Sequence, residues 1–311
     1  MYPSMKTSIT WSLILAALIS VPIVLSAAPC TANPAIDVVS RVERVKARRV
    51  RVVSPYTVNV YALHLLNEDH PGNRALVKAY LDWYLRHLNY PDRWGLTGTI
   101  YDYRIQYRAG ARPRETPLRT YDSADAYAGT FLLLFSSYVL KSRDRAFMEE
   151  HIGRLKDVAY VIVRLVDPDD GLTVALPGKK TKYLMDNAEA YAGLLYFTRL
   201  LALNVSSPGD KRDLRYYRAF DTRLKQGILA GFYNADKGYF YWAIDDGVKS
   251  RPDLKVFYPD LLSQAYPYVY CIKRPDRLYD TVVSEIERHK LTEAQSIILH
   301  LTLGCSRTLP R

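Results

Sequence analysis

The chain has 311 residues, with 43 lysines and arginines against 32 aspartates and glutamates, which gives a formal net charge of +11. In an intracellular protein this excess would suggest nucleic-acid binding, but the sequence has no nucleic-acid-binding motif and begins with the features of an export signal. The histidines show no metal-ligand spacing, and a phosphate-binding loop is absent, so no metal and no cofactor are expected.

Residues 1–32 are predicted to be a signal peptide. Lys6 precedes an apolar stretch over Trp11–Leu25, and cleavage after Ala32 fits the small residues that signal peptidase prefers. An uncleaved membrane anchor is the alternative, although about 15 apolar residues are short for a membrane span. We therefore expect an exported protein, periplasmic or secreted, that is tethered to the membrane if the segment is retained.

Residues 33–53 are predicted to form a basic linker. Arginines and lysines alternate with valines between Arg41 and Val53, as in a solvated tether. An edge strand, or a patch that touches anionic lipid or glycan, are the alternatives. Residues 54–311 are predicted to be one domain, because no low-complexity segment divides them and about 280 mature residues suffice for one large core.

Apolar runs at helical spacing predict pairs of helices separated by glycine turns and extended loops. The predicted helices are Thr57–Leu66, Asn73–Leu88, Ala124–Leu140, Arg143–Leu165, Asp186–Leu203, Arg212–Ala230, Leu261–Cys271, Asp276–Glu287 and Glu293–Leu303. Short segments that favour strand follow the glycine turns, as in Thr97–Tyr103 and Tyr239–Ile244. The fold class is therefore all-α, with repeated helical hairpins and short β-hairpin loops at one end.

An octapeptide occurs twice, as Asp122–Gly129 and again as Asp186–Gly193, and each copy opens an apolar helix. Weaker relatives of the same helix start occur at Asn59 and Gln264. A repeat of this kind indicates a repeated supersecondary unit. The first helix of each pair is rich in alanine and glycine and the second in charge, which favours an inner and an outer layer, and thus a closed α/α toroid over an open solenoid.

These helix starts, Asp-(Ser/Asn)-Ala-(Asp/Glu)-Ala-Tyr-Ala-Gly, resemble those of the six-hairpin, or α/α-toroid, glycosidases over about residues 54–303, and are most similar to those of a bacterial cellulase-type family. The resemblance implies a carbohydrate substrate. The Ser-Glu-Gly segment that carries the general acid in that family has no counterpart here, because Ser54–Asn59 contains no acid.

Four acids at the two repeated helix starts are the candidate catalytic residues: Asp122, Asp125, Asp186 and Glu189. Glycoside hydrolysis needs one protonated carboxyl to donate to the leaving oxygen, and one carboxylate to activate water or attack carbon. The alternative is structural, because acids three residues apart at a helix start can form a capping box. The loop acids Asp102 and Asp246 could face the same end of the fold.

Aromatic and acidic residues of the loops are candidates for substrate binding, because aromatic rings stack on sugar rings. These candidates are Trp94, Tyr101, Tyr121, Tyr127, Tyr191, Trp242, Asp245, Tyr258 and Asp260. The alternative for Trp94 and Trp242 is that each packs its own loop against the helices. Arginines between Arg104 and Arg119 make the first long loop basic, which would suit anionic sugars.

Cys271 and Cys305 are an even pair if the first cysteine leaves with the signal peptide, so in an oxidising compartment they could form one disulfide. Two buried free thiols are the alternative. No motif around either cysteine indicates catalysis or metal binding.

These observations predict an exported glycoside hydrolase that acts on an envelope or secreted polysaccharide or oligosaccharide, with anionic polymers included. Peripheral contact with the envelope is expected, and no nucleic acid is expected as a partner. A polysaccharide lyase on the same fold is one alternative. A non-catalytic glycan-binding or assembly protein on a degenerate toroid is the other, because amides replace the repeated acid at Asn59 and Gln264.

Overall fold

The computed structural model describes residues 33–42, 50–68, 70–108, 111–203 and 208–289. The predicted signal peptide and the predicted helix Glu293–Leu303 lie outside these residues. Within them, the helices pair as the sequence predicts. The pairs are α3 (Pro55–Asn67) with α4 (Pro71–Arg86), α5 (Ala124–Ser142) with α6 (Arg145–Leu165), α7 (Leu184–Ala202) with α8 (Pro208–Gly231), and α9 (Leu262–Val269) with α10 (Arg277–Arg288).

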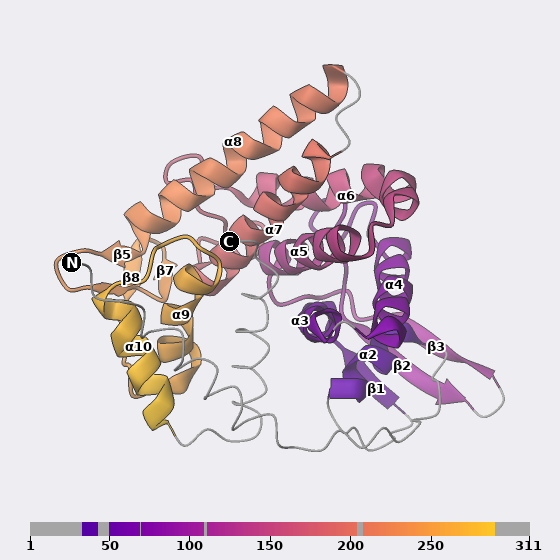
Figure 1. Cartoon of the computed structure of the whole chain (residues 1–311), viewed down its shortest axis with the longest axis horizontal. Coiled ribbons are helices and arrows are strands. Elements are labelled where there is room, and N and C mark those ends of the chain that lie inside the picture. The colour runs from indigo at the N-terminus through magenta and orange to yellow at the C-terminus, as the bar shows by residue number, and fades with distance from the viewer. Residues whose placement is uncertain (1–32, 43–49, 69, 109–110, 204–207, 290–311) are drawn as a thin grey trace, which may run out of the picture. The chain divides into compact units, whose positions relative to one another are not determined.

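The first helices of the pairs form an inner row. α3 packs on α5, α5 on α7 and α7 on α9, whereas each second helix packs on its own partner. Figure 1 shows α5 and α7 side by side, with α6 and α8 on their outer side. Every residue of α5 from Ala124 to Val139 is buried, because a helix that is apolar all round must be covered all round. The charged second helices bury one face only.

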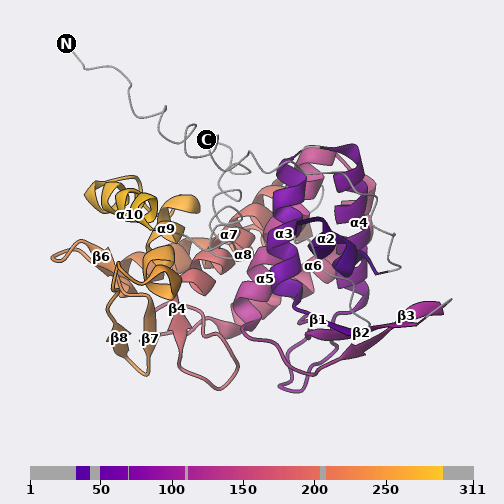
Figure 2. The same ribbon diagram turned by 90° about the horizontal axis from the view of Figure 1, so that it is seen from below.

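The strands are short and connect the helical hairpins. One antiparallel sheet has the order β1 (Val50–Val53), β2 (Tyr103–Arg108), β3 (Ala111–Pro117), and a second the order β4 (Lys182–Tyr183), β7 (Ala243–Asp245), β8 (Val248–Ser250). β5 (Tyr233–Asn234) and β6 (Tyr239–Phe240) form a hairpin. Both three-stranded sheets lie along the same side of the helices (Figure 2), where the sequence predicts β-hairpin loops at one end.

The glycine that closes each octapeptide lets α5 and α7 touch through their backbones. A Cβ atom added to Gly193 would lie 2.3 Å from the carbonyl oxygen of Gly129, and one added to Gly129 would lie 2.6 Å from the carbonyl oxygen of Glu189. No side chain fits at such distances. The repeated glycine therefore sets the crossing of the two central helices, and with it the relative position of the acids at their starts.

The amides that replace the repeated acid bind neighbouring segments. Asn59 donates to the carbonyl oxygen of Tyr127 at 3.3 Å and to the hydroxyl of Thr130 at 3.0 Å, and accepts from the hydroxyl of Tyr80 at 2.8 Å. Gln264 makes 2.8 Å hydrogen bonds to both the backbone amide and the carbonyl of Phe240. Both amides thus fix the positions of adjacent elements.

The structure differs from the predicted basic linker over residues 33–53. Helix α2 (Pro34–Val42) packs on α3 and α4, and its Ala35 and Val38 are fully buried. β1 is the edge strand of its sheet and pairs with β2 from Val50 to Val53. The described parts of this stretch therefore belong to the folded unit. Their valines and alanines supply an apolar face, although the high arginine content of the segment suggested a solvated tether. Residues 43–49 lie outside the described part.

Candidate active site

The repeated acids are not arranged as capping boxes. α5 begins at Ala124 with Ser123 as its N-cap, and α7 begins at Leu184 with Tyr183 as its N-cap; neither side chain makes a capping hydrogen bond. Asp125 and Asp186 therefore lie in the first turn of their helices. The carboxyl groups of Asp125 and Glu189 each accept a hydrogen bond from a neighbouring segment, from Thr173 and from Tyr56.

Asp125 is fully buried. One carboxyl oxygen accepts a 2.6 Å hydrogen bond from the hydroxyl of Thr173, and the other accepts from the amide of Ala126 at 3.0 Å. Thr173 is itself held by Asn187, which bonds to its amide at 2.7 Å and to its carbonyl at 3.1 Å. Burial, with a smaller contribution from Asp122, raises the pKa of Asp125 to about 6.

Glu189 lies deeper, with 1% of its surface exposed. Its Oε1 accepts a 2.9 Å hydrogen bond from the hydroxyl of Tyr56, whereas its Oε2 is buried with no hydrogen-bond partner among the residues that the structure describes. Burial and the charge of Asp125 raise the pKa of Glu189 to about 8, against the opposing effect of the Tyr56 hydrogen bond. The surroundings of Glu189 therefore favour its protonated form.

Asp186 is half-buried and lies between the buried acids and the surface. Burial raises its pKa well above the ordinary value, and the charges of Asp125, Glu189 and Asp122 raise it further. Asp122 is exposed, and it acts on Asp125 as well as on Asp186. The four acids predicted from the sequence are thus brought together, two in a buried layer and two nearer the solvent.

A fifth acid, Asp102, extends this cluster. Its carboxylate accepts a 2.9 Å hydrogen bond from the hydroxyl of Tyr127. Burial and the charge of Asp122 raise its pKa. The ring of Tyr127 stacks on that of Tyr56, with the ring centroids 5.8 Å apart. Two parallel tyrosines therefore donate to two different acids, Tyr127 to Asp102 and Tyr56 to Glu189.

Tyr56 was not predicted, yet the repeat contains the signal that identifies it. It precedes Asn59 by three residues, the same spacing that separates the two acids of each octapeptide. The aligned pairs are Tyr56 with Asn59, Asp122 with Asp125, and Asp186 with Glu189. The first member of each pair therefore points to the shared site.

Aromatic side chains predicted to bind substrate form two groups. In the first, Tyr121 donates to Asp92 at 2.7 Å, and Tyr101 accepts from the backbone amide of Arg93 at 2.6 Å. Trp94 lies 4.7 Å from the ring of Tyr121, and the guanidinium of Arg93 lies over it at 3.9 Å. Trp94 therefore packs within its own loop, which was the alternative to stacking on a sugar ring.

The second group adjoins the acids. The rings of Tyr183 and Trp242 are stacked, with centroids 6.3 Å apart and planes 5° from parallel. Tyr258 is 58% exposed and belongs to the short helical turn η1 (Phe257–Leu261). Burial and the charges of Asp186 and Glu189 raise the pKa of Tyr258. This hydroxyl therefore lies where the acids approach the surface.

Three predicted residues make other contacts. The ring of Tyr191 faces α8, with Lys225 Nζ 5.8 Å from its centre. Asp245 accepts a 2.6 Å hydrogen bond from Thr181, and Asp260 accepts a 2.7 Å hydrogen bond from the amide of Asp253. The structure does not bring Tyr191 to the acids, and it engages Asp245 with the loop before β4 and Asp260 with the segment before η1.

The predicted disulfide cannot be located, since Cys305 lies outside the described residues. Cys271 is exposed at the end of α9, which differs from the alternative of two buried thiols. Over the described part of the chain, no three His, Cys, Asp or Glu side chains are grouped as a metal site would require, and no helix is both long and apolar enough to cross a bilayer.

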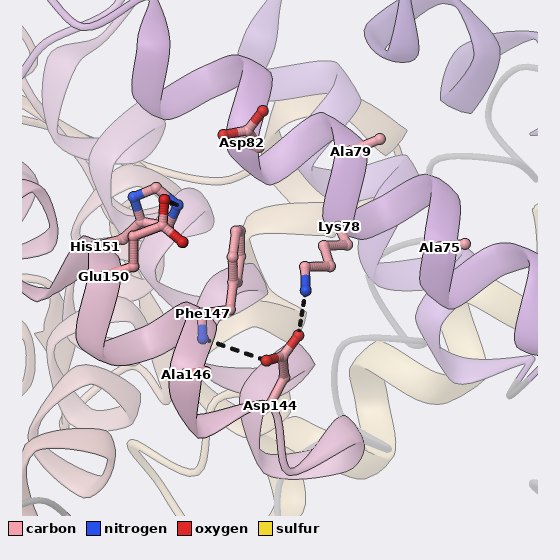
Figure 3. A pocket seen from close by; sticks show the side chains of 9 residues that line it. All are labelled: Ala75, Lys78, Ala79, Asp82, Asp144, Ala146, Phe147, Glu150 and His151. Carbon is pink, nitrogen blue, oxygen red and sulfur yellow. Dashed lines mark hydrogen bonds and ion pairs between the residues drawn. The ribbon is translucent and has the colours of Figure 1, made fainter.

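A groove of about 530 Å³ lies elsewhere, between α4 and α6 (Figure 3). The ammonium of Lys78 is paired with Asp144 at 2.6 Å and lies over the ring of Phe147 at 4.8 Å. None of the four predicted catalytic acids lines this groove. Its charged groups belong to the outer helices and not to the repeated helix starts. The acids clustered at the starts of α5 and α7 remain the candidate site.

Comparison with known proteins supports the fold. No protein-family model matches the chain, and no curated protein matches its sequence. Among solved structures, a rhamnosidase from Klebsiella oxytoca with rhamnose bound matches with a TM-score of 0.52 and 11% identity, over 83% of this chain and 47% of the rhamnosidase. This chain therefore spans about half the length of that enzyme.

Two further solved structures match at lower scores. A GH76 α-mannanase from Bacteroides thetaiotaomicron matches with a TM-score of 0.44 and 10% identity, over 82% of this chain and 68% of the mannanase. A sugar epimerase from a ruminal bacterium matches with a TM-score of 0.45 and 10% identity, over 78% of this chain and 61% of the epimerase. At such identities a match concerns the fold alone. The chain has an α/α-toroid fold, as its repeated helix starts predict.

Proposed function

We propose that the protein is a glycoside hydrolase in which Asp186 is the general acid and Asp122 the general base. The observation that carries this proposal is the pairing of a half-buried acid, whose pKa burial and neighbouring acids raise, with an exposed acid close enough to act on it. Acid and base of a hydrolase must differ in protonation at the same pH, and different environments produce that difference.

The reaction follows from these protonation states. Asp186 donates its proton to the glycosidic oxygen as the bond to the anomeric carbon breaks, and Asp122 takes a proton from the water that attacks this carbon. The proton lost by Asp186 is restored from solvent. Both residues lie nearer the surface than Asp125 and Glu189, so they are the two that a bound glycan can reach.

The buried acids have a supporting role in this proposal. Asp125 and Glu189 act on Asp186 and raise its pKa, so they keep the proton on it until a glycan arrives. Tyr258 and Trp242 lie beside the cluster and offer aromatic faces for a sugar ring. The substrate is an envelope or secreted polysaccharide, or an oligosaccharide derived from one, and residues 1–32 direct export to the compartment that contains it.

The test is digestion of a glycan panel, with products read by mass, by the wild type and two variants. Asp186→Asn and Asp122→Asn should each reduce the cleavage rate by about 10²- to 10⁴-fold, since each removes one proton-transfer group. Asp82→Asn, in the groove between α4 and α6, is the matched control and should cleave at the wild-type rate.

Other outcomes would select a different function. Unchanged cleavage by both variants would refute the assigned roles. A product that absorbs in the near ultraviolet would identify a lyase, which leaves a double bond in the sugar. Glycan binding without turnover by the wild type would identify a binding or assembly protein on the same fold.

A further inference from the structure

We propose that this site selects against anionic sugars, so that the sugar unit bound beside Asp186 carries neither a carboxylate nor a sulfate. The proposal names the substrate class of the proposed hydrolase and rests on the same site. The net charge of +11 suggested that the substrate is anionic. The candidate site is instead a cluster of acids, so the opposite preference is proposed.

Five carboxyl groups converge on this site from three segments of the chain: Asp102, Asp122, Asp125, Asp186 and Glu189. They perturb one another, since Asp122 acts on Asp102, Asp125 and Asp186. Glu189 is buried, and its Oε2 has no hydrogen-bond partner among the residues that the structure describes. A place in which the protein keeps its own acids protonated is unfavourable for the carboxylate of a ligand.

Two lysines of the loop before α7 are paired with other acids. Lys182 is buried and paired with Asp167 at 2.6 Å and Asp170 at 2.7 Å, while Lys180 is paired with Asp246 at 2.6 Å. These pairs commit the ammonium groups of Lys180 and Lys182 to carboxylates of the protein itself.

Two of the arginines that the sequence suggested for uronate binding are also placed elsewhere. Arg104 and Arg114 are exposed on the β2–β3 hairpin, which extends away from the helices (Figure 2). The guanidinium of Arg93 lies over Trp94. An arginine fork directed at a sugar carboxylate, the usual means of binding a uronate, is therefore not formed by these residues.

The expected difference in affinity between a neutral and an anionic sugar follows from the charge interactions among these acids. One unit of pKa corresponds to a tenfold change in an equilibrium constant. A uronate placed beside Asp122 and Asp186 should therefore bind at least about tenfold more weakly than a neutral sugar of the same shape. Because Asp122 is exposed, salt should reduce this difference.

The experiment compares a uronate-containing oligosaccharide with its carboxyl-reduced form, which has the same linkages and no charge. Dissociation constants are measured by calorimetry, in low and in high salt. We expect the neutral form to bind at least about tenfold more tightly in low salt, with a smaller difference in high salt. Asp122→Asn should narrow the difference in affinity between the two forms, and the control Asp82→Asn, in the groove between α4 and α6, should leave it unchanged.

Binding that is equal for the two forms, tighter for the uronate, or undetectable for both would overturn the proposal. The readout is independent of turnover, so the two proposals fail separately. Selective binding of the neutral form without cleavage would refute the hydrolase alone. Cleavage with a preference for the uronate would refute charge selection alone.

Discussion

Burial separates the roles of residues that look alike in the sequence. Asp125 and Glu189 occupy equivalent places in the two octapeptides, as do Asp122 and Asp186, yet Asp122 is exposed whereas Asp186 is half-buried beside two other acids. A carboxyl in water and one among carboxyls hold their protons differently. The chemical asymmetry that acid–base catalysis needs therefore arises from the surroundings of identical side chains.

The buried Glu189 should make stability depend on pH. Its pKa of about 8 in the folded protein lies above the ordinary 4.5, so folding takes up a proton. Between about pH 4.5 and about pH 8 its effect on the free energy of unfolding becomes increasingly unfavourable, by a few kcal/mol in total. Glu189→Gln should match the wild type in melting temperature near pH 5 and exceed it near pH 8.

The melting temperatures of both proteins are measured by thermal unfolding across this pH range. The exposed Glu149→Gln is the matched control, and its difference from the wild type should stay constant with pH. A constant difference for Glu189→Gln as well would show that folding does not raise the pKa of Glu189.

At the scale of elements, the acids depend on how closely α5 and α7 approach. Gly129 and Gly193 bring the two backbones into contact, and Asn187 and Thr173 connect the start of α7 to Asp125. Side chains from α3, α5, α7 and the loop before β2 reach the same site only because these inner helices are adjacent. The contact between helices is thus as much a part of the site as its carboxyl groups.

Gly193→Ala should be strongly destabilising. The added methyl group would lie 2.3 Å from the carbonyl oxygen of Gly129, so the helices must separate, at a cost of about 1–3 kcal/mol or more. Gly153→Ala, in α6 with nothing within 4 Å of the added atom, is the control and should stabilise by about 0.5–1 kcal/mol. Urea unfolding compares the two, and equal effects would contradict the backbone contact.

At the scale of the whole molecule, the folded unit begins before the first helical hairpin. α2 closes over α3 and α4, and Asn33 donates to Glu115 of β3 at 2.5 Å. Glu115 also accepts from His87 at 2.8 Å and from Trp83 at 3.1 Å. One carboxylate thus joins the N-terminal segment to α4 and to the first sheet, and the pKa of Glu115 is lowered by these hydrogen bonds against the effect of burial.

Val38→Asp should therefore unfold or severely destabilise the protein, by roughly 3 kcal/mol or more, because it buries an unpaired charge in α2. Val52→Asp, the same substitution at a position 64% exposed on the edge strand β1, should cost less than about 1 kcal/mol. Denaturant midpoints measure both. If residues 33–53 were a solvated tether, Val38→Asp would behave like Val52→Asp.

The sequence by itself determined the helical pairs, their inner and outer order and the toroid fold, because the octapeptide repeat and helical periodicity are local patterns that can be recognised without any alignment. It also identified the helix starts at which the acids gather. These features depend on residues close in the chain, whose spacing fixes which face of a helix they share.

Only the tertiary structure decided which acids are buried, that Tyr56 and Asp102 join them, that Tyr191 faces α8, and that residues 33–42 and 50–53 are folded. Burial and the charge around a carboxyl are produced by segments distant in sequence. The site is acidic although the chain as a whole is basic. Its local charge depends on which side chains are neighbours in space, and neither the net charge nor the arginine-rich loop predicts that.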